Sequence, residues 1–222
     1  MAESLQTTHV SSRVRVEFYA SGVLLLLGIM LGSQFFPGRQ WMAGTAIYYA
    51  WVFLWGLRHL HLHTNASGAL ARLGLGFWVT WVRVVALGLL IGILGQLSIL
   101  SDYPWAAFGL YSWLMVLDGL DGFAARLSGT VSEFGARLDN HSDALGIAAA
   151  SILAVWLNVL PPIYLALSGG YFIFHFGLWF RERFGWVVYR DRMMNSLHNR
   201  YFAGVHMLLL AVSLVPGCDG FV

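Results

Sequence analysis

Long apolar stretches alternate with short polar segments along the chain, and this pattern predicts a bundle of membrane-crossing helices. A helix needs about 17–25 apolar residues to cross a bilayer. On that scale the pattern predicts seven spans, at about residues 18–36, 41–57, 79–100, 103–125, 134–160, 163–180 and 201–217. The fifth and sixth spans share one long charge-free run, which Pro161-Pro162 divides because proline lacks an amide donor. The predicted fold class is therefore all-α, a polytopic membrane protein with about six or seven transmembrane helices.

Composition supports this fold class, because 58% of the 222 residues are hydrophobic and only 11% are charged. Globular soluble domains usually carry about 25% charged residues. The single cysteine, Cys218, excludes an intrachain disulfide framework. We expect one integral membrane domain over residues 1–222, in which extra N-terminal helices at about 1–65 precede a core at about 72–217.

The positions of the arginines predict how the chain is oriented in the membrane. All 13 basic residues are arginine. If the N-terminus lies in the cytoplasm, every arginine except Arg39 falls on the cytoplasmic side, in agreement with the usual excess of basic residues there. We therefore expect an integral protein of a bacterial inner membrane, in contact with the lipid bilayer and with its active site facing the cytoplasm.

Four aspartates gather at the facing ends of the fourth and fifth predicted spans. Asp118 and Asp121 are three residues apart, and Asp139 and Asp143 are four apart, so each pair shares one helix face. Between the pairs, the segment 130–133 has the spacing of a capping box from Thr130 to Glu133, which predicts the start of the fifth helix. Carboxylates at a membrane boundary are costly, so they are usually paired, metal-bound or catalytic.

The chemistry of this cluster points to phosphate. Two antiparallel helix ends with two carboxylates each suit Mg²⁺ or Mn²⁺, and two such ions can clamp the attacking and leaving oxygens of a phosphoryl displacement. Arg126 offers a planar fork for phosphate, while Gly122 and Ala125 leave room for a ligand. Two alternatives stay open: the carboxylates pair with Arg83, Arg126 and Arg137, or they conduct cations through the bundle.

The cluster resembles the signature of the CDP-alcohol phosphatidyltransferase family, D-x2-D-G-x2-A-R-x8-G-x3-D-x3-D. All eight fixed positions are present, namely Asp118, Asp121, Gly122, Ala125, Arg126, Gly135, Asp139 and Asp143. In that family an acceptor hydroxyl attacks the phosphate of a CDP-linked alcohol, and CMP leaves. Relatives often open their first helix with an Asn-x-x-Thr-x-x-Arg string, of which this chain keeps Thr80 and Arg83, while Phe77 replaces the Asn.

The resemblance implies a role for each of these residues. Asp118, Asp121 and Asp139 would bind metal, whereas Asp143 would bind metal and also act as the base on the acceptor hydroxyl. The residues implied in substrate binding are Gly122, Ala125, Arg126, Ser132, Gly135, Thr80 and Arg83.

The same resemblance implies a function. It implies transfer of a phosphatidyl group from a CDP-alcohol, here CDP-diacylglycerol, to an acceptor alcohol in phospholipid biosynthesis, with two Mg²⁺ or Mn²⁺ ions as cofactors. The alternatives are a transferase that joins a CDP-linked headgroup to diacylglycerol, and a metal-binding membrane protein without catalysis. No nucleic-acid partner is expected, and a homodimer stays open.

Two further polar segments each keep two interpretations. His59, His61 and His63 form either a polar helix end or a metal site, and the metal site requires an extended backbone to bring them to one side. A basic segment after the sixth span is either a topology signal that attracts anionic lipid or, with Arg83 and Arg137, an acceptor-phosphate pocket. Its arginines are Arg181, Arg183, Arg190, Arg192 and Arg200.

Overall fold

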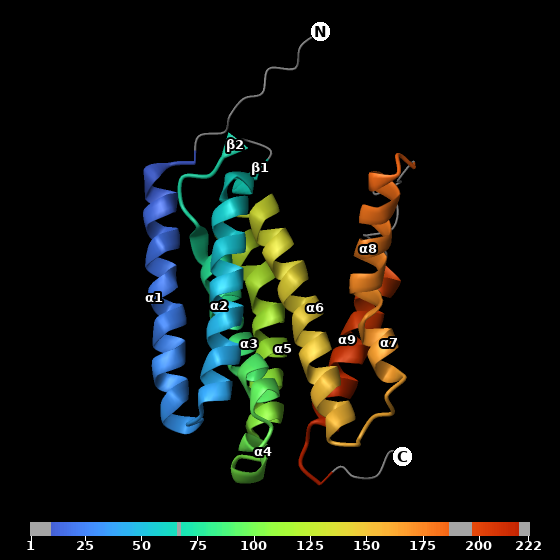
Figure 1. Cartoon of the computed structure of the whole chain (residues 1–222). Helices are drawn as coiled ribbons and strands as arrows, with labels where there is room; N and C mark the ends of the chain where they lie inside the picture. Colours follow the sequence, from blue (N-terminus) through green and yellow to red (C-terminus); the bar gives the residue numbers. More distant parts are fainter. Residues whose placement is uncertain (1–9, 66–67, 187–196, 218–222) are drawn as a thin grey trace.

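The computed structural model describes residues 10–65, 68–186 and 197–217, and helices make up most of this part of the chain (Figure 1). Two long helices come first, α1 (Ser12–Phe35) and α2 (Arg39–His59), followed by the short 3-10 helix η1 (Leu60–Leu62). The strands β1 (Thr64–Asn65) and β2 (Gly68–Ala69) pair antiparallel as a small hairpin. The predicted all-α fold class is confirmed, since only these four of the described residues form strands and most of the others form helices.

The rest of the chain adds three further long helices and several shorter ones. The long helices are α3 (Gly74–Gly95), α5 (Ala106–Leu127) and α6 (Glu133–Trp156). A single turn, α4 (Ile99–Asp102), connects the first two of them. The C-terminal part contains α7 (Tyr164–Ser168), α8 (Gly170–Arg183) and α9 (Leu197–Ser213). In Figure 1 the five long helices run side by side, and α7, α8 and α9 stand at the outer side of α6.

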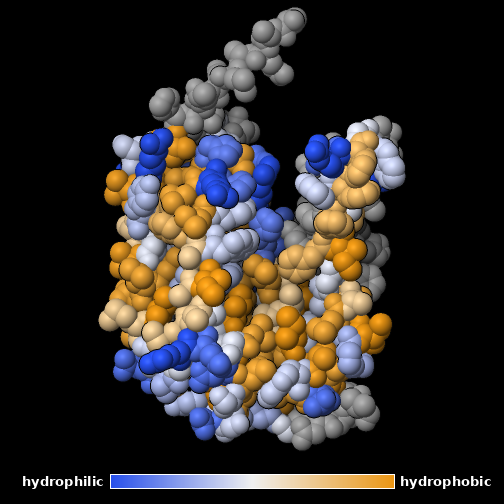
Figure 2. Space-filling view, in the orientation of Figure 1, coloured by the Kyte–Doolittle hydropathy of each residue, from blue (hydrophilic) through white to orange (hydrophobic). Residues whose placement is uncertain are grey.

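Many large apolar side chains are exposed on the surface of the bundle. Two of the described helices, α1 and α3, are long and apolar enough to cross a membrane, with mean hydropathy of 1.8 and 2.1. Figure 2 shows apolar side chains over the middle of the visible face and polar ones towards its two ends. This distribution is consistent with a membrane protein, and the number of six or seven spans stays a prediction.

The sixth predicted span, 163–180, differs from the expected single helix. The structure divides it into α7 and α8, and Gly169 and Gly170 lie at the junction. Glycine is the weakest helix former after proline, so two in succession are a natural place for a helix to break. The resulting helices of 5 and 14 residues are each shorter than a membrane crossing requires.

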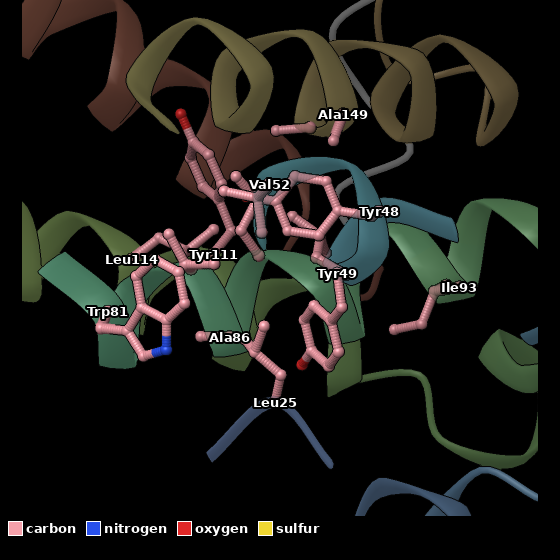
Figure 3. Close-up of a cluster of buried hydrophobic side chains, with 14 of the residues drawn as sticks. Leu25, Tyr48, Tyr49, Val52, Trp81, Ala86, Ile93, Tyr111, Leu114 and Ala149 are labelled. Atoms are coloured by element: carbon pink, nitrogen blue, oxygen red, sulfur yellow. The ribbon is translucent and has the colours of Figure 1, made fainter. Parts of the chain in front are cut away.

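The N-terminal helices are packed against the central helix α3. The Thr45 hydroxyl of α2 donates to the Gly88 carbonyl of α3 at 3.1 Å, and the Tyr49 hydroxyl donates to the Val85 carbonyl at 2.7 Å. A Cβ atom at Gly88 would lie 2.0 Å from the ring of Tyr49, so only glycine permits this approach. Figure 3 shows Tyr49 within the cluster of buried side chains around α3. This packing holds α2, and the segment after it, against the helix that carries Arg83.

Candidate functional site

Three helices meet at the end of the bundle where α5 finishes and α6 begins. Asp118 and Asp121 lie in the last part of α5, Asp139 and Asp143 lie in the first half of α6, and Arg83 lies on α3. The turn between α5 and α6 is short, so the two pairs of aspartates face each other across it. The juxtaposition expected from their spacing is therefore present in the structure.

The start of α6 differs by two residues from the predicted capping box. The N-cap is Ser132, whose backbone is extended and whose hydroxyl accepts from the Gly135 amide at 3.1 Å. The Thr130 hydroxyl instead shares a hydrogen bond of 2.6 Å with the Ser128 hydroxyl. Both residue types suit an N-cap, and the extended backbone at Ser132 decides between them. The prediction of Thr130 as the cap is therefore wrong.

The guanidinium group of Arg83 lies among all four carboxylates. Its Nη1 is 2.9 Å from an Asp143 oxygen and 3.4 Å from an Asp121 oxygen, and the group also contacts Asp118 and Asp139 directly. The Arg83 side chain is only 2% exposed. Arg83 therefore holds the aspartates of α5 and α6 together from the α3 side.

Two other arginines that the sequence offered as partners, Arg126 and Arg137, form no ion pair with the four aspartates among the described contacts. Arg137 pairs with Glu133 at 2.5 Å on the outer face of α6. Arg126 makes no ion pair with the four aspartates within the described part of the chain and lines the cavity described below. Arg181 and Arg183 end α8 at an exposed position, and Arg190 and Arg192 lie outside the described residues.

The carboxylate cluster has the donor set and the charge of a divalent metal site. One guanidinium group against four carboxylates leaves a net of three negative charges when all are ionised. Such an excess is costly in a partly buried site and favours binding of further cations. Ligand oxygens of Asp118, Asp121 and Asp139 lie within 4.8 Å of one another. Carboxylate oxygens suit Mg²⁺ and Mn²⁺, so the residues present fit such an ion.

A cavity of about 280 Å³ adjoins this cluster and opens between α3, α5 and the start of α6. Two of the aspartates, Asp121 and Asp139, form part of its wall. The residues implied in substrate binding that line it are Thr80, Gly122, Ala125, Arg126, Ser132 and Gly135. Arg83 does not line it and instead lies behind the carboxylates, which differs from the substrate contact expected of it.

Small residues shape the cavity where α3 crosses α5. A Cβ atom at Gly76 would lie 2.5 Å from the Ala125 Cβ, so the two helices approach as closely as their backbones allow. A Cβ atom at Gly122 would lie 3.3 Å from the Arg126 guanidinium. A larger side chain at Gly122 would therefore displace Arg126 or fill the space in front of it. The Thr80 hydroxyl completes this wall, 3.2 Å from an Asp121 oxygen.

His63 also lines the cavity, and the sequence did not single it out. The residue is 4% exposed, and its ring contacts the Ser132 hydroxyl and the Arg72 carbonyl. By contrast, His59 and His61 contact carbonyls of their own helix end, at 2.8 and 2.9 Å. Among the described residues the three histidines form no metal-binding group. No signal in the sequence separates His63 from its neighbours, because all three occur in the same alternating pattern.

A second and much smaller cavity, of about 20 Å³, lies on the other side of the aspartates. Asp118, Asp143 and Tyr111 line it, together with Met207 of α9. This volume has room for roughly one water molecule. The Tyr111 hydroxyl is buried and has no hydrogen-bond partner among the described residues. Arg83 also lines this cavity, and its Nε, like the Tyr111 hydroxyl, has no hydrogen-bond partner among the described residues.

Together the apolar helical bundle, the carboxylate cluster and the adjoining cavity are the features of a helical membrane protein with a site suited to divalent metal. The chain belongs to the CDP-alcohol phosphatidyltransferase family, whose sequence model matches residues 75–215. The family resemblance of the aspartate motif is thus confirmed. The match begins after α1, α2 and the hairpin, so His63 lies outside it.

One curated relative is the CDP-diacylglycerol--serine O-phosphatidyltransferase of Methanocaldococcus jannaschii. The two chains are 34% identical over 92 residues, which cover 39% of this chain and 44% of the relative. The chain therefore spans less than half the length of this relative. No solved structure matches the chain.

Proposed function

We propose that the chain transfers a phosphatidyl group from CDP-diacylglycerol to the hydroxyl of an acceptor alcohol in phospholipid biosynthesis, with release of CMP. The observation that carries the proposal is the cavity of about 280 Å³, which has carboxylates on one wall and Arg126 with the start of α6 on another. The printed name of the relative supports CDP-diacylglycerol as donor and serine as one candidate acceptor. Family membership supports the transfer of a substituted phosphate group.

The donor phosphates would lie between Arg126 and the first turn of α6. The free amides at a helix N-terminus and the helix dipole favour an anion there. Arg126 can add a bidentate contact that a lysine could not provide. Gly122 would leave the space in front of Arg126 open, and Gly135 would let the phosphate approach the backbone.

Asp118, Asp121 and Asp139 would hold divalent ions. The resemblance to the family implies that two ions bind. When bound, such ions would neutralise charge on the phosphate oxygens and favour ionisation of the acceptor hydroxyl. Arg83 would keep the carboxylates oriented from the buried side and compensate part of their charge. Thr80 would orient the Asp121 oxygen that it contacts.

Asp143 would act as the general base. It lies against Arg83 at 2.9 Å and lines the small cavity, on the side of the cluster away from Arg126. There it would accept the proton of the acceptor hydroxyl, while the acceptor oxygen forms a bond to the phosphorus of the phosphatidyl group. The bond from that phosphorus to the CMP oxygen would break, and CMP would leave.

We also propose that the site faces the cytoplasm of a bacterial inner membrane. The end of the bundle that carries the site also carries Arg13, Arg58, Arg72 and Arg126, which supports this orientation. The nucleotide part of the donor and a polar acceptor are both water-soluble. A site that faces the cytoplasm would therefore be accessible to both. We further propose that residues 1–222 act as one domain with the core at about 72–217.

The test is product analysis with the purified full chain in lipid nanodiscs. CDP-diacylglycerol and Mg²⁺ are supplied with a panel of acceptors that includes serine, glycerol phosphate and inositol phosphate, and lipids and CMP are both quantified. We expect one acceptor to give a new phospholipid together with CMP. A new lipid only from diacylglycerol and a CDP-linked headgroup would favour the alternative transferase. Metal binding without CMP release in any arm would favour a non-catalytic protein.

A further inference from the structure

The connection between α2 and α3 contributes two residues to the cavity lining, Leu73 and the polar residue His63. Residues 60–73 precede the part of the chain that matches the family. Even so, His63 is 4% exposed and lines the same cavity as Arg126, Ser132 and Gly135. The N-terminal helices thus contribute to a site that the family motif alone would assign to α3, α5 and α6.

The hydrogen bonds of His63 fix which atoms donate and which accept. The Arg72 carbonyl can only accept, so Nε2 of His63 carries a proton and donates to it at 2.8 Å. Burial lowers the pKa of His63, so the ring stays neutral at pH 7 and its Nδ1 is an acceptor. The Ser132 hydroxyl then donates to Nδ1 at 3.1 Å, which leaves its oxygen to accept from the Gly135 amide at 3.1 Å.

The other end of this chain of contacts is held by α1. One carboxylate oxygen of Glu17 accepts from the Leu73 amide at 2.8 Å, and the other accepts from Arg13 at 2.9 Å. Glu17 therefore holds the residue next to Arg72, whose carbonyl orients His63. A continuous path of hydrogen bonds and covalent bonds joins the first helix of the chain to the first turn of α6.

We propose that His63 is a positioning residue for the donor-phosphate site, a role that rests on the proposed function. By accepting from the Ser132 hydroxyl, His63 fixes the hydroxyl rotor and keeps Ser132 in place as the N-cap of α6. The first turn of α6 and the preceding loop then stay in the arrangement that faces Arg126. Without His63 the Ser132 hydroxyl is free to rotate and to leave the Gly135 amide, and the phosphate-binding wall of the cavity loosens.

The test compares steady-state kinetics of His63→Phe, His63→Asn and Ser132→Ala in nanodiscs. Phenylalanine keeps a ring against Phe134 but removes both hydrogen bonds. We expect KM for CDP-diacylglycerol to rise about tenfold, the effect of one lost buried hydrogen bond, with kcat and the acceptor KM within about twofold. Asparagine can still accept from Ser132 and should recover most of the loss. The His63→Phe, Ser132→Ala double variant should be no worse than either single one, since both break the same contact.

A matched control is available two residues away. His61 is exposed and does not line the cavity; its ring bonds to the Arg58 carbonyl and stacks with His59, so His61→Phe should leave KM unchanged. An unchanged KM for CDP-diacylglycerol in His63→Phe would overturn the proposal, and so would equal losses in kcat and both KM values, which indicate general unfolding. If His63→Phe does not fold, a wild-type KM in Ser132→Ala would overturn it. Absence of CMP release by the wild-type chain would count against the proposed function instead.

Discussion

Replacement of Arg83 by methionine should make the stability of the protein depend on divalent metal. Methionine preserves the volume and flexibility of the side chain but leaves four carboxylates facing one another without their shared cation. Removal of one partner of a buried ion pair costs about 3–5 kcal/mol. We take the lower end, about 3 kcal/mol, because three of the four carboxylates, those of Asp118, Asp139 and Asp143, are partly exposed.

The measurement is thermal unfolding of Arg83→Met in detergent, with EDTA and with excess Mg²⁺. An ion that binds only the folded state at about 100 times its Kd contributes about 2.7 kcal/mol, so Mg²⁺ should restore most of the lost stability. The matched control is Arg137→Met, which breaks the exposed pair with Glu133 and should cost less than about 1 kcal/mol. An EDTA-treated Arg83→Met protein as stable as the wild type would refute the assignment of Arg83 as the organiser of the cluster.

Four further results are expected. Arg126→Lys should raise KM for CDP-diacylglycerol about tenfold with little change in kcat, because lysine loses the bidentate fork. Asp143→Asn should lower turnover at least about 100-fold while equilibrium binding of CDP-diacylglycerol persists. Gly88→Ala should lower the unfolding midpoint because its Cβ meets a tyrosine ring at 2.0 Å, whereas Gly109→Ala, with nothing within 4 Å, should not. Burial lowers the pKa of His63 below the usual histidine value of 6.5, so protonation of this ring favours the unfolded state. The unfolding midpoint should therefore fall as the pH drops below 6.5, and it should fall less in the His63→Asn variant.

The aspartate cluster could be predicted because its geometry is local. Positions three or four residues apart share a helix face, and a short turn between two helices brings such faces together. Asp118, Asp121, Asp139 and Asp143 accordingly meet in the structure as their spacing indicated. The same local argument does not extend to Arg83, because its position depends on how α3 packs against α5 and α6.

The features that the sequence missed depend on contacts between distant segments. His63 has the same sequence context as two other histidines, and only its contact with Ser132, 69 residues away, distinguishes it. Thr130 and Ser132 are both good N-caps by residue type, so the backbone conformation had to choose between them. The break at Gly169 was masked by the apolar run around it, which hydropathy alone cannot divide.

The most direct test of the account is the rate of CMP release from CDP-diacylglycerol by the full chain in nanodiscs, measured with the productive acceptor as Mg²⁺ is varied. We expect release that needs both acceptor and metal and that falls at least about 100-fold in Asp121→Asn. The Asp102→Asn variant changes an exposed carboxylate at the end of α4, at the opposite end of the bundle from the site (Figure 1), and should keep the wild-type rate. Metal-independent release, or an Asp121→Asn protein as active as Asp102→Asn, would contradict the central claim that the carboxylate cluster is the catalytic site.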